Sequence, residues 1–203
     1  MTRAELLTIF ERYLKRNDLT DLYSDFIRMA EARINAVVRL SEMEVRSTST
    51  PTEAFWALPD DFIEMRHIQA AVSRGDRVLE YLTPEQADNN RLVYGSSGGY
   101  RAYSILDNQI EIIPHPTADS ETVVEMFYYA KPAALANAGD TNDVVTNYPN
   151  LYLYAMLGEA ALYREAAAQA EQWLNSFDAF AKQLNTRAQT ARFSGDSLQM
   201  RAV

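Results

Sequence analysis

The 203-residue chain is 47% hydrophobic and 23% charged, which is ordinary for a globular protein with one sizeable core or two small ones. It contains no cysteine, which excludes disulfides, thiolate zinc sites and cysteine nucleophiles and agrees with synthesis in a reducing cytoplasm. The net charge of −9 disfavours a dedicated DNA-binding module, because such a chain repels phosphates on average. The N-terminus lacks the apolar run of a signal peptide, and no apolar stretch approaches the roughly 20 residues that cross a bilayer. We therefore expect a soluble protein that is not exported and has no membrane partner.

Two helices are predicted at the start of the chain. Thr2 and Glu5 have the spacing of a capping box, and apolar residues then recur at helical intervals until about Arg16. A second helix is predicted from about Thr20. Its expected buried stripe consists of Phe26, Met29, Ala30, Ile34 and Val37.

Strand patterns replace the helical ones after Glu44. Residues with strand propensity, bounded by turn residues, predict strands over 45–50, 55–58, 62–72, 78–81, 101–106, 109–113 and 121–130. Ser73–Asp76 and Asp107–Asn108 are the expected hairpin turns. Between these strands, Thr83 and Pro84 have the cap and first-turn chemistry of a short helix.

Two more helices are predicted after an irregular connection over residues 131–147. Pro149 can begin the first of them, in which Ala155, Gly158 and Ala160 are small enough to let a neighbouring helix approach closely. The last helix has apolar residues at steps of four and three, which is the seam spacing of a helix packed along another: Ala170, Leu174, Phe177, Ala181, Leu184 and Ala188. We expect this seam to pack within the chain, because three other helices are available.

The order of these elements predicts an α+β fold. Residues 1–44 and 148–188 would form a four-helix bundle, and residues 45–130 would form an inserted antiparallel β-rich domain. Residues 131–147 would connect the two, and residues 189–203, which lose all periodicity, would be a flexible C-terminal tail.

The reactive side chains form no pattern that is typical of a catalytic or metal site. His67 lies in a strand pattern and His115 between two prolines, without ligand-spaced partners. Asp60, Asp61 and Glu64 could bind a cation, but Pro-Asp-Asp is also a turn sequence, which we favour. Asp60 and Asp61 make a poor glycosidase pair, because adjacent strand positions point to opposite faces. We expect no metal, no cofactor and no enzymatic activity.

Two further features favour binding between proteins over chemistry. The Gly95–Gly99 stretch lacks the Lys-Ser or Lys-Thr pair and the strand-to-helix context of a phosphate-binding loop, so we interpret it as a flexible loop. The chain has 12 tyrosines, which could stack on nucleic-acid bases. With a net charge of −9, a protein interface or a half-buried core is the better interpretation of them.

An ordered set of motifs along most of the chain resembles the adaptor proteins of tailed bacteriophages, which are head–tail connector or head-completion proteins. The set begins with the Asp25–Asn35 helix segment, the Met43–Arg46 strand start and the Leu-Pro-Asp-Asp-Phe turn at 58–62. It continues through 81–85, 103–105, 110–116, 128–132, 148–154 and 159–160.

The resemblance implies a structural virion protein that is made in the host cytoplasm and lies at the head–tail junction. It would form a ring, twelvefold in the virion, that joins the portal protein to tail or nozzle proteins. It would help to retain packaged DNA, which would pass through the ring without specific binding. The alternative is a tail-side or regulatory protein-binding module that makes no portal contact.

The end of the chain carries a separate hypothesis. Its basic and apolar residues could order on binding and dock onto the portal: Arg192, Phe193, Leu198, Met200 and Arg201. The alternative is a disordered terminus without a partner.

Overall fold

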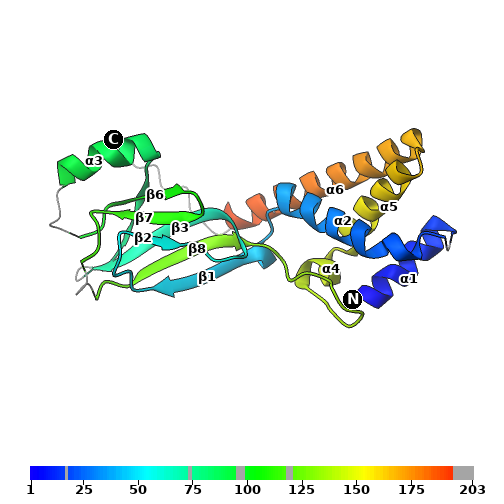
Figure 1. Ribbon diagram of the computed structural model, residues 1–203, viewed down its shortest axis with the longest axis horizontal. Helices are drawn as coiled ribbons and strands as arrows, with labels where there is room; N and C mark the ends of the chain where they lie inside the picture. The colour runs from blue at the N-terminus through cyan, green and yellow to red at the C-terminus, as the bar shows by residue number, and fades with distance from the viewer. Residues whose placement is uncertain (17, 73–74, 95–98, 118–120, 194–203) are drawn as a thin grey trace. The chain divides into compact units, whose positions relative to one another are not determined.

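The computed structural model describes residues 1–16, 18–72, 75–94, 99–117 and 121–193, without the side chains of 72, 75, 76, 94, 192 and 193 (Figure 1). The chain divides into two compact units, a helical unit of Met1–Met43 with Lys131–Val203 and a β unit of Glu44–Ala130. Long helices and most strands are thus segregated along the chain, and the predicted α+β class is confirmed.

The helical unit contains α1 (Arg3–Leu14), α2 (Tyr23–Val37), α4 (Asp143–Asn147), α5 (Pro149–Tyr163) and α6 (Ala167–Phe193), with short 3-10 turns at Thr20–Leu22 and Ser41–Met43. The predicted capping box opens α1: the Glu5 amide donates to Thr2, and the Glu5 carboxylate accepts from the Thr2 amide. Lys15, at a φ of 55°, ends this helix. Pro149 is the first residue of α5, as expected for a ring that presets φ and needs no hydrogen-bond partner there.

Helix α5 is the central element of this unit, because it contacts α1, α2, α4 and α6. It is buried on nearly all sides, and a Cβ added at Gly158 would lie 2.5 Å from Cδ2 of Leu174 on α6. The expected close approach of two helices is therefore present, at Gly158. Among the predicted seam residues, Ala170, Phe177, Ala181 and Leu184 are buried.

Three predictions for the helical unit were wrong. Met29 and Val37 are 50% and 43% exposed, and Ile27, at 1%, lies on the buried face instead. Alternative stripes on one helix differ by a small rotation, so the pattern of α2 alone could not select the right one.

Residues 131–147 are not wholly irregular, because Asn142 caps α4 by accepting from the Val145 amide at 2.8 Å. Helix α6 continues through Phe193, so residues 189–193 of the predicted flexible tail are helical. Ala188, Gln189 and Ala191 favour a helix even without an apolar stripe.

The described residues of the β unit form two four-stranded sheets and one helix. The first sheet is antiparallel and has the order β1 (Glu44–Ser49), β8 (Val124–Ala130), β3 (Phe62–Val72) and β4 (Gly75–Val78). The second has the order β2 (Phe55–Ala57), β7 (Gln109–Ile113), β6 (Ala102–Leu106) and β5 (Glu80–Tyr81), and α3 (Pro84–Tyr94) lies between β5 and β6 in the chain. Residues 73–74 of the predicted turn between β3 and β4 are outside the described part of the chain, as are 95–98 of the glycine-rich loop.

One pairing departs from the predicted antiparallel arrangement, since β5 and β6 are parallel. The intervening α3 carries the chain back to the same end of the sheet, which is what a parallel pair requires. The predicted strand 78–81 is also divided. The Leu79 amide donates to Ile68 in the first sheet, and the Glu80 amide donates to Arg101 beside the second.

The core of the β unit lies between the two sheets. It is built from alternate residues of their strands, including Ile68, Ile110, Ile112, Val124, Met126 and Tyr128. The opposite face of the second sheet is covered by α3 through a small apolar cluster of Leu82, Ala87, Ala102 and Ile113. At the predicted turn between β6 and β7, Asp107 and Asn108 have φ values of 48° and 59°, which fits the type I′ hairpin that favours Asp and Asn.

Candidate interaction surfaces

One acidic residue of the predicted turn, Asp61, has a structural role. Asp60 and Asp61 lie in the turn between β2 and β3, as expected. The Tyr128 hydroxyl, which is in the core of the β unit, donates to Asp61 Oδ1 at 3.1 Å. Burial and the neighbouring Asp61 raise the pKa of Tyr128 to about 12. Asp61 therefore anchors a core side chain.

His67 belongs to a cross-strand row on the face of the first sheet that points away from the core. Its ring stacks on Phe127 of β8 with centroids 4.3 Å apart, and Arg46 of β1 places its guanidinium 5.9 Å from the Phe127 ring centre. In the next row Glu125, only 8% exposed, accepts from Arg46 and Gln69. Burial and the positive charge of Arg66 lower the pKa of His67.

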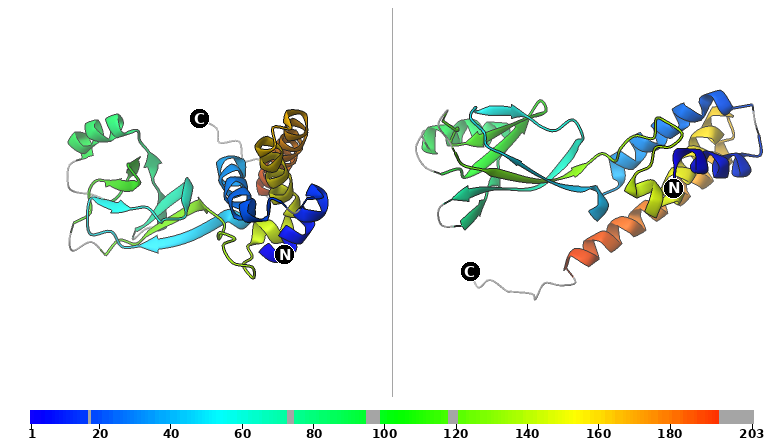
Figure 2. Two further views of the ribbon diagram at one scale, coloured as in Figure 1. Left: turned by 45° about the vertical axis from the view of Figure 1, so that its right-hand side comes forward. Right: turned by 90° about the horizontal axis from the view of Figure 1, so that it is seen from below.

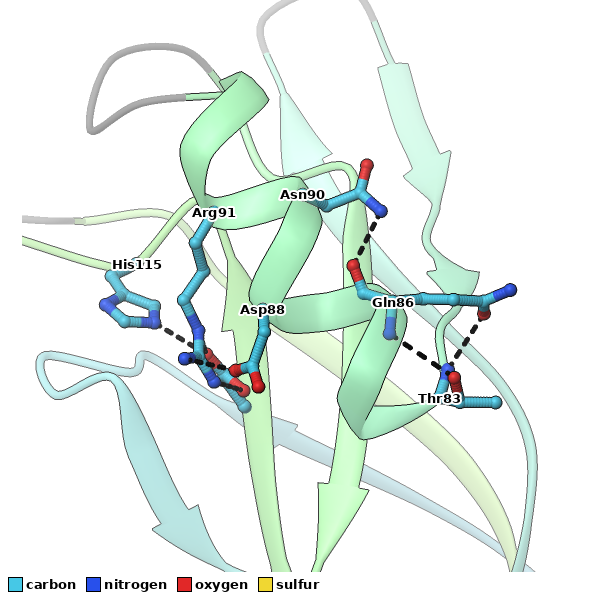
Figure 3. A network of polar contacts seen from close by, with 7 residues as sticks. Thr83, Gln86, Asp88, Asn90, Arg91 and His115 are labelled. Carbon is cyan, nitrogen blue, oxygen red and sulfur yellow. Dashed lines mark hydrogen bonds and ion pairs between the residues drawn. The ribbon is translucent and has the colours of Figure 1, made fainter.

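A second polar network fixes α3 to its sheet (Figure 3). Arg91 donates from Nε and Nη2 to the two carboxylate oxygens of Glu111, at 2.5 and 2.8 Å, and its Nη1 lies 2.7 Å from Asp88. His115 Nε2 is 2.7 Å from the same Glu111 carboxylate, which is 5% exposed. Burial alone would raise the pKa of Glu111, but the hydrogen bonds from Arg91 and His115 outweigh it and lower the pKa.

The same helix is ordered at its start and presents apolar side chains near its end. Thr83 and Gln86 cap it reciprocally, each accepting from the other's backbone amide at 3.1 to 3.4 Å (Figure 3). Leu92 and Val93, in the last turn, are 88% and 76% exposed. Within the described residues no group of three or more His, Asp and Glu side chains could hold a metal ion, and Glu111 and Asp88 are engaged with Arg91.

The helical unit carries a row of aromatic rings that we call the aromatic ladder: Tyr13, Trp173, Tyr154 and Phe180. The Tyr13 and Trp173 rings are 6.2 Å apart, Trp173 stacks on Tyr154 at 5.8 Å, and Tyr154 lies 6.5 Å from Phe180. Tyr13 is 54% exposed and the other three rings are half-buried. The ladder joins α1, α5 and α6 and leaves part of each ring open to solvent.

A second apolar surface lies where α2 meets α5, and we call it the Met29 patch: Met29 and Tyr163. These side chains are 50% and 60% exposed. Two contacts bracket Met29 along α2, the Phe26–Tyr163 ring pair at 6.2 Å and the Arg33–Glu159 ion pair at 2.6 Å. Met29 thus shares one surface with the end of α5.

Helix α6 has 27 residues and α5 has 15, so α6 continues past the end of α5 (Figure 2). Asn185, in the extending part, binds the end of α2. Its amide donates to the Val37 carbonyl at 2.8 Å, and its oxygen accepts from the Arg39 amide at 2.9 Å. A side-chain amide can satisfy both kinds of free backbone group at a helix end.

The structure describes only two of the five predicted portal-docking residues. Arg192 and Phe193 are the last two residues of α6, and only their backbone is described. Leu198, Met200 and Arg201 lie outside the described residues.

In the described part of the chain, no helix is both long enough and apolar enough to cross a membrane.

Sequence reasoning missed the surfaces that the structure brings together. Trp173 and Phe180 are seven residues apart, next to the seam positions. This spacing could have predicted that the two rings lie on the same face of α6. Arg91 and Glu111 are separated by 20 residues, and no local pattern pairs them.

Comparison with known proteins supplies the family. A search of the curated proteins found no match. The family model described as SU10 adaptor protein matches residues 1–201. Structural adaptor families are not typically enzymatic, and a phage adaptor is a component of the virion. Because the match extends over nearly the whole chain, this protein belongs to the SU10 adaptor protein family.

Proposed function

We propose that this protein joins the portal to the tail of a tailed phage as a ring of identical copies and helps to retain the packaged DNA. The family match over residues 1–201 carries the proposal. The partly exposed aromatic side chains of the helical unit support it, because aromatic residues are enriched where proteins meet. The proposal assigns no catalytic step to the chain.

The details of this assembly are part of the same proposal. The ring would be twelvefold, with α1, α2, α5 and α6 of each copy acting as a four-helix bundle. The protein would be made in the host cytoplasm and would join the virion at the head–tail junction. The net charge of −9 supports passage of DNA without specific binding, because tight binding requires many cationic phosphate contacts.

We also propose that the end of the chain docks onto the portal through Arg192, Phe193, Leu198, Met200 and Arg201. The extension of α6 beyond α5 supports this, because it carries the chain away from the helices that could otherwise cover it. Basic and apolar residues in one short segment can order on a partner surface.

Electron microscopy of the protein mixed with portal rings tests the function. We expect a symmetric extra layer on the portal, with a copy number readable from its symmetry. A protein that left portal rings bare and bound a purified tail protein would contradict the proposal and favour a tail-side module.

Two truncations test the docking segment. A chain ending at Thr186 keeps Asn185 and its hydrogen bonds to the end of α2 but loses all five proposed docking residues, so we expect it not to bind the portal. The matched control ends at Phe193 and keeps Arg192 and Phe193, and we expect it to bind with intermediate affinity. Full portal affinity in the chain that ends at Thr186 would refute the docking hypothesis.

A further inference from the structure

Two separate apolar surfaces of the helical unit lie on opposite sides of its central helix. Tyr154 belongs to the aromatic ladder and Tyr163 to the Met29 patch. They are nine residues apart on α5, and at about 100° per residue they point in opposite directions. One copy therefore has two partly exposed faces that cannot contact the same neighbour at the same place.

We infer that the aromatic ladder of one copy packs against the Met29 patch of the next copy. The inference rests on the proposed ring and names the surfaces that would close it. A ring of identical chains requires a heterologous contact, in which each copy uses two different faces. The helical unit has two such faces, with the rings of the ladder on one and the partly exposed Met29 and Tyr163 on the other.

Exposed cations border the ladder at the end of α1. On α6, the positions that share the side of Trp173 and Phe180 are Gln169, Ser176, Gln183 and Arg187, and Arg187 interacts with Glu42 within the chain. On α1, the residue before Tyr13 is the exposed Arg12, and the exposed Lys15 ends the helix. Arg16, beyond the helix, is neutralised by an ion pair with Asp18. The exposed acids of this part of α6, Glu171 and Asp178, belong to the opposite side of the helix.

The charges around the Met29 patch have the opposite sign. Asp25 lies one turn before Met29 on the same side of α2, and Glu165 follows Tyr163 by two residues. Both are exposed. The neighbouring cations are engaged within the chain, since Arg33 pairs with Glu159 and Arg28 interacts with Glu31. Arg164, the residue after Tyr163, donates to Gln169 at 2.8 Å. This complementarity favours a second copy as the occupant, because it aligns the cationic border of one face with the acidic border of the other.

The contact is small for a permanent pair. A few partly exposed side chains offer much less than the about 800 Å² per partner that a stable interface buries. We therefore expect free copies to associate weakly through these faces, and a template to be needed for a closed ring, in which every copy makes the contact twice.

Cross-linking between single cysteines tests the contact, because the natural chain has none. Gln183→Cys places a thiol beside the ladder and Ala32→Cys places one beside Met29, both at exposed positions. The two full-length variants are mixed and treated with a short bismaleimide, once at high protein concentration and once with portal rings. We expect 183–32 dimers. Glu171→Cys, which lies on the opposite side of α6, is the matched control and should give none with Ala32→Cys.

The outcomes separate the two proposals. A 183–183 dimer in place of the mixed one would show that the ladder meets itself and would overturn the inference. An extra layer on the portal without 183–32 products would overturn it too, while the proposed function stands. A 183–32 product without any portal layer would support the contact and refute the function.

A further variant measures the strength of the contact. Tyr163→Ala removes the largest side chain of the Met29 patch, and we expect the yield of 183–32 dimer to fall roughly tenfold, as for an interface residue that contributes more than 1 kcal/mol. Circular dichroism verifies that the variant is folded. A folded Tyr163→Ala chain with unchanged cross-linking would contradict this role of the patch.

Discussion

Helices α6 and α3 are fixed to their units by different means. The long α6 lies against α5 through small and apolar residues, and at Gly158 the two helices leave no room for a side chain. The 11-residue α3 covers a small apolar cluster, and the buried Glu111 holds it through Arg91. A long helix buries enough apolar surface for shape to position it, whereas a short one buries little and depends on a directed ion pair.

The largest expected effect is in the contact that depends on shape. Gly158→Val would place methyl groups where Leu174 already lies 2.5 Å from the first added carbon. We expect a loss of about 3 kcal/mol in the free energy of unfolding, because overpacked cores shift or strain. Urea denaturation measures it. Leu174→Ala in the same chain should recover part of the loss.

Gly139→Val is the matched control for that substitution, since nothing lies within 4 Å of a Cβ at Gly139. It should change the free energy of unfolding little. Equal losses at the two glycines would show that steric conflict with Leu174 is not the cause.

The contact that depends on charge should be weaker and more local. Glu111→Gln removes the carboxylate that Arg91 and His115 share, and we expect a loss of about 2 kcal/mol. The loss is smaller than for a fully buried pair because the Arg91 side chain is 38% exposed. Hydrogen exchange should show the amides of α3 opening more readily than those of α6. Asp88→Asn, at a carboxylate that is 68% exposed, is the control and should have little effect.

The pH dependence of Glu111→Gln sharpens the comparison between α3 and α6. The folded-state pKa of Glu111 is lowered, so its contribution to stability is present above the ordinary carboxylate pKa and is lost as the pH falls through the folded value. The deficit of Glu111→Gln should therefore be largest near neutral pH and shrink under acidic conditions. A deficit that did not change with pH would mean that the charge of Glu111 is not what holds α3.

The smallest expected effect has the opposite sign and lies in the helical unit. Burial raises the pKa of Glu31, although its carboxylate accepts from the Leu135 amide at 2.8 Å. Glu31→Gln keeps an acceptor oxygen and removes the charge, so we expect a gain of less than about 1 kcal/mol at neutral pH. The gain should disappear as the pH falls below the ordinary value, where the natural side chain is also protonated. Chemical denaturation at two pH values measures it, and destabilisation at neutral pH would refute the expectation.

Local patterns were sufficient where neighbours in sequence determine the structure. The Thr2–Glu5 cap, the Asp107–Asn108 turn and the start of α5 at Pro149 each follow from the chemistry of a few adjacent residues. Each of these features joins residues that are only a few positions apart, so the local sequence contains all the partners.

Features that depend on distant partners could not be predicted in the same way. Leu79 lies between β4 of the first sheet and β5 of the second. The residues next to it in sequence do not reveal that its amide donates to the Ile68 carbonyl. The parallel pairing of β5 and β6, the Arg91–Glu111 pair and the aromatic ladder all require knowledge of which elements become neighbours. For α2, tertiary contacts selected Ile27 over Met29 as a buried residue.

The two hydrogen bonds of Asn185 have a mechanical consequence. They tie the backbone at Val37 and Arg39, just before the chain leaves for β1, to the helix whose end we propose as the portal anchor. A pull along α6 would load both bonds at the same time, so tension at the end of the chain would reach residue 39 without passing through the intervening loops.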